Sequence, residues 1–399
     1  MNNRPILITH REPQIIPRPL LTHTNHKAVV PLSTADQGTA VAKRAKRKPM
    51  LALLISAYNE ELVLGNTILS AINAGMDPED IYVVSDGSKD RTVEVAREIL
   101  PHENVIKVEN GGKGSALSKG SKHFALTDRY SWIHIADADG GFAPDYFKVF
   151  RSSLRVKYAA ATGYVRSLPG GPVSQYRVLE YTVGQEIHRR FQALTHTVTV
   201  IPGPTSCFRS DIFAQLDFAN KSLTEDFDVT LQIHRKKLGK IQFIPDAIAF
   251  TQDPRNLKDY KKQITRWNRG VMQGIRRHGV GRHANRLDVY LSYQVAQNLL
   301  FFAGYCVYVP YMAMRTGSLN VIALTFLYDV FITFVITFLA AMRAKRMDIL
   351  SAFPHIYAFR WISTYVFLKA FVEVVFLRRF KVTEGTWEPP TRYKNTTPA

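Results

Sequence analysis

Aspartates at the ends of two apolar runs are the first sign of chemistry in this sequence. Asp86 ends one run, in VVSDGS, and Asp137 and Asp139 end another, in HIADADG. An Asp-x-Asp pair suits a hard divalent cation, which takes carboxylate oxygens together with the phosphate oxygens of a substrate. The same pair could instead form a turn before two glycines, because aspartate is a common turn residue.

A glycine-rich segment lies between these acids. It reads NGGKGSALSKG, from Asn110 to Gly120, and a helical pattern begins within it. Its Lys113 is followed by glycine rather than by serine or threonine, so the segment does not match a Walker phosphate-binding loop. Backbone amides and a lysine at the start of a helix still favour binding of an anion.

A third acidic group, Thr224-Glu225-Asp226, stands directly before a helical pattern. One reading is structural: a threonine caps the helix and acids follow in its first turn, which stabilises a helix by about 1 kcal/mol. These three residues alone leave a chemical role open.

Gln263, Arg266 and Trp267 lie in the basic stretch KKQITRWNRG, just upstream of the longest apolar region in the chain. A tryptophan among so many cations fits an interfacial membrane helix, where aromatic and basic side chains anchor at the level of the headgroups. A nucleic-acid patch and a sugar-binding platform have a similar composition. The stretch by itself does not decide among the three.

The elements that must position these residues follow from hydrophobic periodicity. Continuous apolar runs bounded by turn residues predict strands, and apolar repeats at every fourth residue predict helices. The predicted strands are 50–56, 80–86, 104–110 and 130–139, and the predicted helices begin near 64, 91 and 113. This alternation predicts an α/β fold with a parallel, doubly wound sheet covered on both faces. Such sheets bind ligands beyond the carboxyl ends of their strands, where the acids lie.

Composition adds bounds on the kind of protein. The chain has 399 residues, is 46% hydrophobic and carries a formal net charge of +19. Its two cysteines are far apart in sequence, which argues against a disulfide framework and fits a reducing compartment. No early apolar run predicts a signal peptide. Residues 1–48 are basic and lack periodicity, so we expect a disordered arm that contacts anionic lipid.

Two apolar stretches near the C-terminus are long enough to cross a bilayer, which takes about 20 residues. Residues 289–314 contain no charged side chain, and residues 316–342 contain only Asp329. We expect spans at about 289–314 and 318–342. Arginines before the first stretch and the RAKR cluster after the second, Arg343–Arg346, predict a hairpin with both ends in the cytoplasm.

A third apolar stretch, residues 349–377, is interrupted by ionisable side chains and followed at once by a basic cluster. If it crossed the membrane, that cluster would lie outside, against the charge bias of membrane proteins. We therefore expect an amphipathic helix over about 352–378 that lies in the cytoplasmic interface.

Five motifs, taken in order, resemble those of a known enzyme family. ISAYNEE, VVSDGS, ADADG, TEDFD and QITRW have the order and approximate spacing of family 2 glycosyltransferases. Gln-x-x-Arg-Trp resembles the signature of the processive synthases of cellulose, chitin, hyaluronan and poly-β-N-acetylglucosamine. The resemblance covers residues 50–393. It implies a GT-A type, Rossmann-like catalytic domain with C-terminal transmembrane and interfacial helices.

The resemblance implies roles on the donor side of a site. Tyr58 and Glu60 would border the nucleoside pocket of a nucleotide sugar. Asp86 would bind its base or ribose, and Lys113 would reach its phosphates.

The same resemblance implies a metal site and a mobile tail. Asp137 and Asp139 would hold Mg²⁺ or Mn²⁺ on the diphosphate, with Asp139 the more direct ligand. The segment FKVTEGTWEPPTRY, which begins at residue 380, resembles the gating or switch loop of these synthases. Its Trp387 and Arg392 would close over the diphosphate.

On the acceptor side, the resemblance makes Asp226 the general base and places Glu225, Gln263, Arg266 and Trp267 around the acceptor. Trp267 would offer a flat apolar face on which a sugar ring can stack. A base is needed because a sugar hydroxyl is a poor nucleophile until its proton is removed. One base and one metal site suit a single displacement that inverts an α-linked nucleotide sugar into a β-linkage.

These inferences divide the chain into four parts. We expect a basic arm (1–48), a catalytic domain that includes the Gln-x-x-Arg-Trp helix (49–285), a membrane region (286–379) and a cytoplasmic loop and tail (380–399). The expected function is transfer of a sugar from UDP-N-acetylglucosamine onto a growing β-linked polysaccharide. The enzyme would sit in the inner or plasma membrane, in contact with lipid, with its catalytic domain in the cytoplasm.

Several alternatives stay open. Transfer of one sugar to a lipid or a short oligosaccharide uses the same residues. Two spans are few for a polymer channel, so a second copy or a membrane partner subunit would add helices, or the product is short. A nucleic-acid-binding membrane protein fits the net charge of +19, but the basic excess flanks the apolar segments and no nucleic-acid motif is present. We expect no nucleic-acid partner. A non-catalytic subunit is disfavoured because every expected acid is present.

Overall fold

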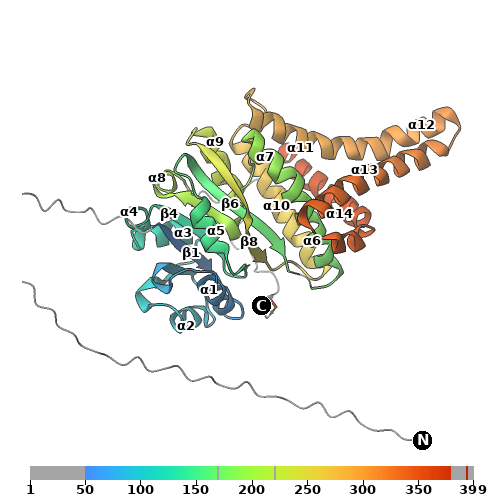
Figure 1. The fold of residues 1–399 in the computed structure, drawn as a ribbon. Coiled ribbons are helices and arrows are strands. Elements are labelled where there is room, and N and C mark those ends of the chain that lie inside the picture. The colour runs from blue at the N-terminus through green and yellow to red at the C-terminus, as the bar shows by residue number, and fades with distance from the viewer. Residues whose placement is uncertain (1–49, 169, 220–221, 379–391, 394–399) are drawn as a thin grey trace, which may run out of the picture. The chain divides into compact units, whose positions relative to one another are not determined.

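Residues 50–251 are built around a mixed β-sheet (Figure 1). The computed structural model describes residues 50–168, 170–219, 222–378 and 392–393, which belong to the unit Lys48–Ala399. The sheet has eight strands in the order β3-β2-β1-β4-β7-β6-β8-β5. Their bounds are β1 Leu51–Ala57, β2 Ile81–Asp86, β3 Val105–Val108, β4 Trp132–Asp137, β5 Gly141–Phe142, β6 Tyr158–Ser167, β7 Ser206–Arg209 and β8 Lys240–Thr251.

The parallel sheet predicted from the sequence is present in only part of this sheet. Strand β1 pairs in parallel with β2 and β4, and β2 pairs in parallel with β3, so the prediction is confirmed for the first four predicted strands. The rest of the sheet is mixed: β6 pairs in parallel with β8, whereas β7 runs antiparallel to both β4 and β6, and β5 runs antiparallel to β8. The chain forms several helices between β6 and β7. It then returns to the sheet between β4 and β6 and runs in the opposite direction to both.

Helices cover both faces of the sheet, and the alternation of buried side chains on β1 shows why. Leu53 and Ile55 pack toward α1 (Leu64–Asn73), α2 (Thr92–Arg97) and α5 (Tyr146–Ser153). Ala52 and Leu54 pack toward the opposite face, with α3 (Lys113–His123), α4 (Leu126–Arg129), α8 (Ser210–Phe213) and α9 (Glu225–Arg235). A strand buried on both faces reads as a continuous apolar run, as LALLISA does.

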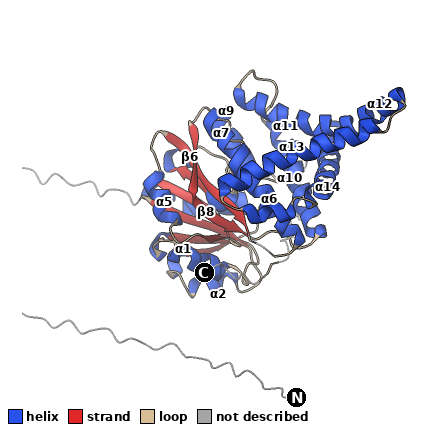
Figure 2. Cartoon of the chain, turned by 45° about the vertical axis from the view of Figure 1, so that its right-hand side comes forward, coloured by secondary structure: helices blue, strands red, loops and turns tan. Residues whose placement is uncertain are grey.

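A second group of helices gathers at one side of the sheet (Figure 2). Its first members enter between β6 and β7 and the others follow β8. They are α6 (Pro172–Val183), the π-helical turn η3 (Gly184–Arg189), α7 (Arg190–Thr195), α10 (Leu257–Arg277), α11 (Arg286–Ala303), the π-helical turn η5 (Gly304–Tyr308), α12 (Val309–Thr316), α13 (Asn320–Ala344), the 3₁₀ turn η6 (Met347–Ala352), α14 (His355–Phe371) and the π-helical turn η7 (Val372–Phe376). The α12–α13 end of this group projects away from the other helices (Figures 1 and 2).

The apolar stretches predicted as membrane segments are helical. Among the described residues, one helix, α13, is long and apolar enough to cross a membrane, and few of its side chains are buried. The first predicted span is divided into α11, η5 and α12. The predicted interfacial helix corresponds to α14, which packs through Ile356 and Phe359 against Tyr260 and Ile264 of α10. The two-span arrangement stays a prediction.

Two glycines allow α10 to pack closely against the start of α9. A Cβ on Gly270 would lie 2.3 Å from Oγ1 of Thr224, and a Cβ on Gly274 would lie 2.7 Å from the ring of Phe227. The two glycines are four residues apart and therefore share one face of α10. Any larger residue at either position would push α10 away from the segment that begins α9.

We predict that Gly270→Ala destabilises the protein by about 1–3 kcal/mol, because the added methyl group overpacks a contact with the buried Thr224. The matched control is Gly304→Ala, at a helical glycine whose Cβ would meet nothing within 4 Å. Thermal unfolding of both purified variants checks the prediction. Equal melting temperatures for the two variants would contradict it.

Candidate active site

A cavity of about 1530 Å³ lies beyond the carboxyl ends of β1, β2 and β4, and α9 and α10 close its other side. Residues of η3, the end of β8 and the first turns of α11 also line it. It contains every predicted site residue that the structure describes: Tyr58, Glu60, Asp86, Lys113, Asp137, Asp139, Glu225, Asp226, Gln263, Arg266, Trp267 and Arg392. Trp387 lies outside the described residues.

Asp86 is held by the glycine-rich segment that follows β3. The backbone N–H of Gly111 donates to Oδ1 of Asp86 at 2.9 Å, and the side-chain amide of Asn110 donates to the Asp86 carbonyl at 2.9 Å. Asp86 is only 4% exposed, yet it lines the cavity. The strand end and the loop therefore fix one carboxylate at the edge of the cavity.

Lys113, the first residue of α3, bridges two acids from different parts of the chain. Its Nζ lies 2.6 Å from Oδ1 of Asp137 and 2.7 Å from Oε1 of Glu225. Burial alone would lower the pKa of Lys113, but the two carboxylates outweigh it and hold the pKa above its ordinary value. The lysine predicted to meet an anion thus meets carboxylates in this structure.

Gly203 allows this bridge to form, and no motif in the sequence pointed to this glycine. A Cβ at Gly203 would lie 2.6 Å from Oδ1 of Asp137 and 2.7 Å from Nζ of Lys113. Gly203 begins the 3₁₀ turn η4 (Gly203–Thr205), which leads into β7. The turn can pass over the ion pair only because this residue has no side chain.

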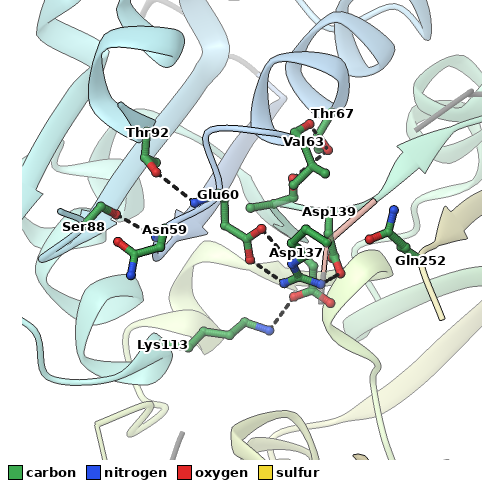
Figure 3. Close-up of polar contacts among 12 residues, drawn as sticks. Asn59, Glu60, Val63, Thr67, Ser88, Thr92, Lys113, Asp137, Asp139 and Gln252 are labelled. Carbon is green, nitrogen blue, oxygen red and sulfur yellow. Dashed lines mark hydrogen bonds and ion pairs between the residues drawn. The ribbon is translucent and has the colours of Figure 1, made fainter. Parts of the chain in front are cut away.

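Arg392 connects two further acids of the cavity, Glu60 and Asp139. Its Nε donates to Oε2 of Glu60 at 2.8 Å, its Nη2 donates to the other oxygen of Glu60, and its Nη1 donates to Oδ2 of Asp139. Figure 3 shows Glu60, Asp137 and Asp139 converging on one region with Lys113 beside them. The predicted metal ligand Asp139 thus already faces a cationic group.

Burial dominates the electrostatics of these acids. It raises the pKa of Glu60 to about 7, although Arg392 opposes the shift. It also raises the pKa of Asp139; Arg392 again opposes the shift, and Asp137 adds to it. Carboxylates crowded in this way need positive charge nearby to remain ionised.

Gln252, just beyond β8, holds the described part of the tail. Its Nε2 donates to the Tyr393 carbonyl at 2.7 Å, and the Tyr393 backbone N–H donates to its Oε1 at 3.1 Å. The guanidinium of Arg255 lies 4.1 Å from the centre of the Tyr393 ring. These contacts place the neighbouring Arg392 in the cavity, and no sequence motif indicated them.

Thr224 does not act as the helix cap that one reading of the sequence suggested. Its side chain makes no capping hydrogen bond to α9, and its Oγ1 has no hydrogen-bond partner among the described residues. Glu225 is instead directed to Lys113. Burial alone would raise the pKa of Glu225, but Lys113 and Arg266 outweigh it and keep the pKa below its ordinary value.

The surroundings of Asp226 bring its pKa closer to neutral pH. Its Oδ1 accepts a hydrogen bond from the Phe227 backbone N–H at 2.8 Å. Burial, with the adjacent Glu225, raises the pKa of Asp226 to about 6, and Lys113 limits the rise. None of the ion pairs among the described residues involves Asp226, so its carboxylate is not committed to a cation.

The Gln-x-x-Arg-Trp residues lie on one face of α10, because positions i, i+3 and i+4 of a helix are neighbours. Nη1 of Arg266 donates to the Leu223 carbonyl at 3.1 Å, which ties α10 to the segment before α9. The ring of Trp267 faces the guanidinium of Arg177, with the ring centre 4.8 Å away. Arg177 is a cavity residue that the sequence did not reveal.

The arrangement of the acids fits a divalent cation shared with a substrate. Among the described residues, no group of three or more His, Cys, Asp or Glu side chains is placed to hold a metal by itself. Asp139 nevertheless accepts a guanidinium, so a positive group is already accommodated on its carboxylate. A Mg²⁺ or Mn²⁺ ion bound there would complete its coordination with substrate oxygens, as such ions do with phosphates.

We predict that Arg392→Gln strengthens binding of Mn²⁺ by about tenfold in the absence of nucleotide, because Arg392 then no longer competes for Asp139. Calorimetric titration with Mn²⁺ checks this. The matched control is Arg91→Gln, which removes an exposed arginine paired with Glu98 outside the cavity. Unchanged Mn²⁺ affinity in Arg392→Gln would contradict the competition.

Comparison with solved structures supports the fold. The mannosyltransferase PcManGT from Pyrobaculum calidifontis, solved in complex with GDP-Man and Mn²⁺, is similar with a TM-score of 0.53 and 16% sequence identity. The similarity covers 84% of this chain and 89% of that chain. The fold is therefore GT-A-like, with a mixed sheet flanked by helices.

Comparison of sequences identifies the family. The chain is 30% identical over 242 residues to a probable glycosyltransferase, YdaM, of Bacillus subtilis, and this match covers 56% of each chain. It is 23% identical over 370 residues to poly-beta-1,6-N-acetyl-D-glucosamine synthase of Staphylococcus epidermidis, a match that covers 86% of this chain and 87% of that one. The first match thus spans little more than half of its relative. Residues 49–270 match the family described as Glycosyltransferase like family 2. This chain belongs to glycosyltransferase family 2, which confirms the resemblance inferred from its five motifs.

Proposed function

We propose that this protein is a membrane-bound, inverting glycosyltransferase that transfers N-acetylglucosamine from UDP-N-acetylglucosamine onto a growing β-linked polysaccharide. The observation that carries the proposal is the single cavity in which strand-end acids, Asp226 and Trp267 come together. The choice of sugar is supported by the Staphylococcus epidermidis relative, whose name specifies a poly-β-1,6-N-acetylglucosamine product.

On the donor side, Tyr58 and Asp86 would hold the nucleoside at the ends of β1 and β2. Asp137 and Asp139 would hold Mg²⁺ or Mn²⁺, which when bound neutralises charge on the diphosphate. Lys113 and Arg392 are the cations of this region, and both now contact carboxylates. A bound diphosphate would offer them stronger acceptors, so they would turn toward the leaving group.

In the transfer step, Asp226 would accept the proton of the acceptor hydroxyl as its oxygen attacks the anomeric carbon of the donor. One carbon–oxygen bond forms, the bond from the anomeric carbon to the diphosphate breaks, and UDP leaves with the bonding electrons. A pKa of about 6 leaves Asp226 mostly ionised at neutral pH and basic enough to take part in the proton transfer. A single displacement inverts the anomeric centre.

On the acceptor side, Trp267 would stack against a sugar ring, while Gln263, Arg266 and Glu225 would face its hydroxyl groups. The four residues line the same cavity as Asp226. A sugar has an apolar face and a polar rim, so an aromatic platform with polar neighbours matches both.

Membrane attachment is part of the proposal. Helix α13 and the helical stretch of α11, η5 and α12 expose large apolar side chains, among them Leu300, Val307, Leu324 and Phe331. A hairpin of these helices in the inner or plasma membrane would place Arg343 and the catalytic part in the cytoplasm. A second copy or a membrane partner subunit would complete a polymer channel.

Transfer of a single sugar to a lipid or short oligosaccharide is the alternative, and product length distinguishes the two.

The principal test uses the pH dependence of transfer. Because Asp226 must be ionised to accept a proton, kcat/KM should fall about tenfold per pH unit below about pH 6 and level off above it. Radiolabelled UDP-N-acetylglucosamine provides the measurement. Glu60 has a pKa of about 7, so Glu60→Gln serves as the control that removes its titration.

Asp226→Asn should abolish transfer and retain UDP binding; transfer near the wild-type rate would refute the assignment.

We also predict that Trp267→Ala abolishes polymer extension while UDP binding persists, because donor and acceptor lie on opposite sides of the reacting bond. The control is Trp361→Ala, at a tryptophan of α14 that is 41% exposed and does not line the cavity. Product sizing and UDP titration measure the two effects. Extension at the wild-type level in Trp267→Ala would leave Trp267 only an interfacial anchor.

A further inference from the structure

Arg177 of α6 is 1% exposed, which makes it an unusual residue to find buried beside a cavity. Its Nε donates to Oδ1 of Asp253 at 3.2 Å and its Nη1 donates to Oε2 of Glu180 at 2.5 Å. Its Nη2 donates to the hydroxyl of Tyr181 at 3.1 Å and to Oε1 of Gln263 at 3.3 Å. A buried arginine is stable only when its charge is paired and its donors are used, and both conditions hold here.

The flat faces of the same guanidinium are also in use. Its central carbon lies 4.7 Å from the centre of the Tyr181 ring, 4.8 Å from that of Trp267 and 5.6 Å from that of Tyr260. Cation–π contacts of this kind strengthen when they are removed from water. One side chain on α6 therefore contacts two of the three signature residues of α10.

These contacts constrain both signature residues. Since Oε1 of Gln263 accepts from Arg177, the amide NH₂ of Gln263 is the end left to donate toward the cavity. Arg177 also lies over one face of the Trp267 ring, so a ligand in the cavity would stack on the opposite face. Without Arg177, the amide could flip and the indole ring could rotate.

We propose that Arg177 is a positioning residue for the acceptor: it orients the Gln263 amide as a hydrogen-bond donor and holds the Trp267 ring as a stacking platform. This inference rests on the proposed function, because it assumes that a sugar acceptor binds at Trp267. Asp253 in turn holds Arg177 from the end of β8 through a side chain that is 1% exposed. Arg177 itself takes no part in bond making.

Lysine cannot replace arginine in this role. A lysine could keep the charge beside Asp253, but it lacks the planar fork that reaches Asp253, Glu180 and Gln263 at once and the flat face that stacks on Trp267. Arg177→Lys therefore removes the contacts that orient Gln263 and Trp267 while it keeps the positive charge.

The experiment measures KM for donor and acceptor separately in the full-length protein. The probes are UDP-N-acetylglucosamine and a β-1,6-linked N-acetylglucosamine tetrasaccharide. In Arg177→Lys we expect acceptor KM to rise about tenfold while donor KM stays within about twofold of wild type. The matched control is Arg235→Lys, at an arginine that pairs with the buried Asp288 and does not line the cavity. This control should change neither KM.

A second measurement keeps the inference testable if a variant does not fold or if the proposed function is wrong. The emission of Trp267, taken as the difference between each protein and its Trp267→Phe counterpart, should shift and become more accessible to acrylamide in Arg177→Lys. If Arg177→Lys does not fold, the charge-balanced pair Arg177→Gln with Asp253→Asn is used instead. Unchanged acceptor KM together with unchanged Trp267 emission would overturn the inference. A wild-type protein that transfers nothing, with Trp267 emission still dependent on Arg177, would refute the proposed function and leave the positioning role standing.

Discussion

The pairing of clustered acids with two cations is the interaction on which the rest of the site depends. Glu60, Asp137, Asp139 and Glu225 reach one cavity from different elements, and Lys113 and Arg392 bridge them. Crowded carboxylates without such partners would take up protons, as the raised pKa of Glu60 already indicates. The same cations are the groups that a diphosphate would attract. The two cations thus oppose the protonation that burial favours at Glu60 and Asp139, and a charged substrate would compete for the same cations.

The end of β8 links the two halves of the cavity. Gln252 holds the tail residue Tyr393 and so places Arg392 beside Glu60 and Asp139, on the proposed donor side. The next residue, Asp253, holds Arg177 and so supports Gln263 and Trp267 on the proposed acceptor side. A change at this strand end would therefore disturb both Arg392 and the Gln263–Trp267 face of α10. The glycines of α10 also shape the cavity, because they let the helix approach the segment that carries Asp226.

Short patterns in the sequence predicted the features that depend on neighbouring residues, namely strands, helices and the acids at strand ends. The first four predicted strands and their helices follow from apolar runs, and the strand-end acids fall in one cavity because parallel strands end at one edge of the sheet. The antiparallel β7 was missed because its place depends on the path of the chain through α6 and α7. Arg177 and Gln252 were missed because their partners lie 86 and 141 residues away, and Gly203 because its role is visible only beside Lys113. No short window of sequence carries such information.

The central claim is that the sugar is transferred in a single displacement. Asp226 acts as the one base, and cations neutralise the charge of the departing diphosphate. The most direct measurement is proton NMR of the product formed from UDP-N-acetylglucosamine and the β-1,6-linked tetrasaccharide, recorded while the donor is being consumed. The account predicts that the newly formed linkage is β from the first turnover, the inverse of the α-linked donor. A new α-linkage would require retention of configuration and would contradict the role assigned to Asp226.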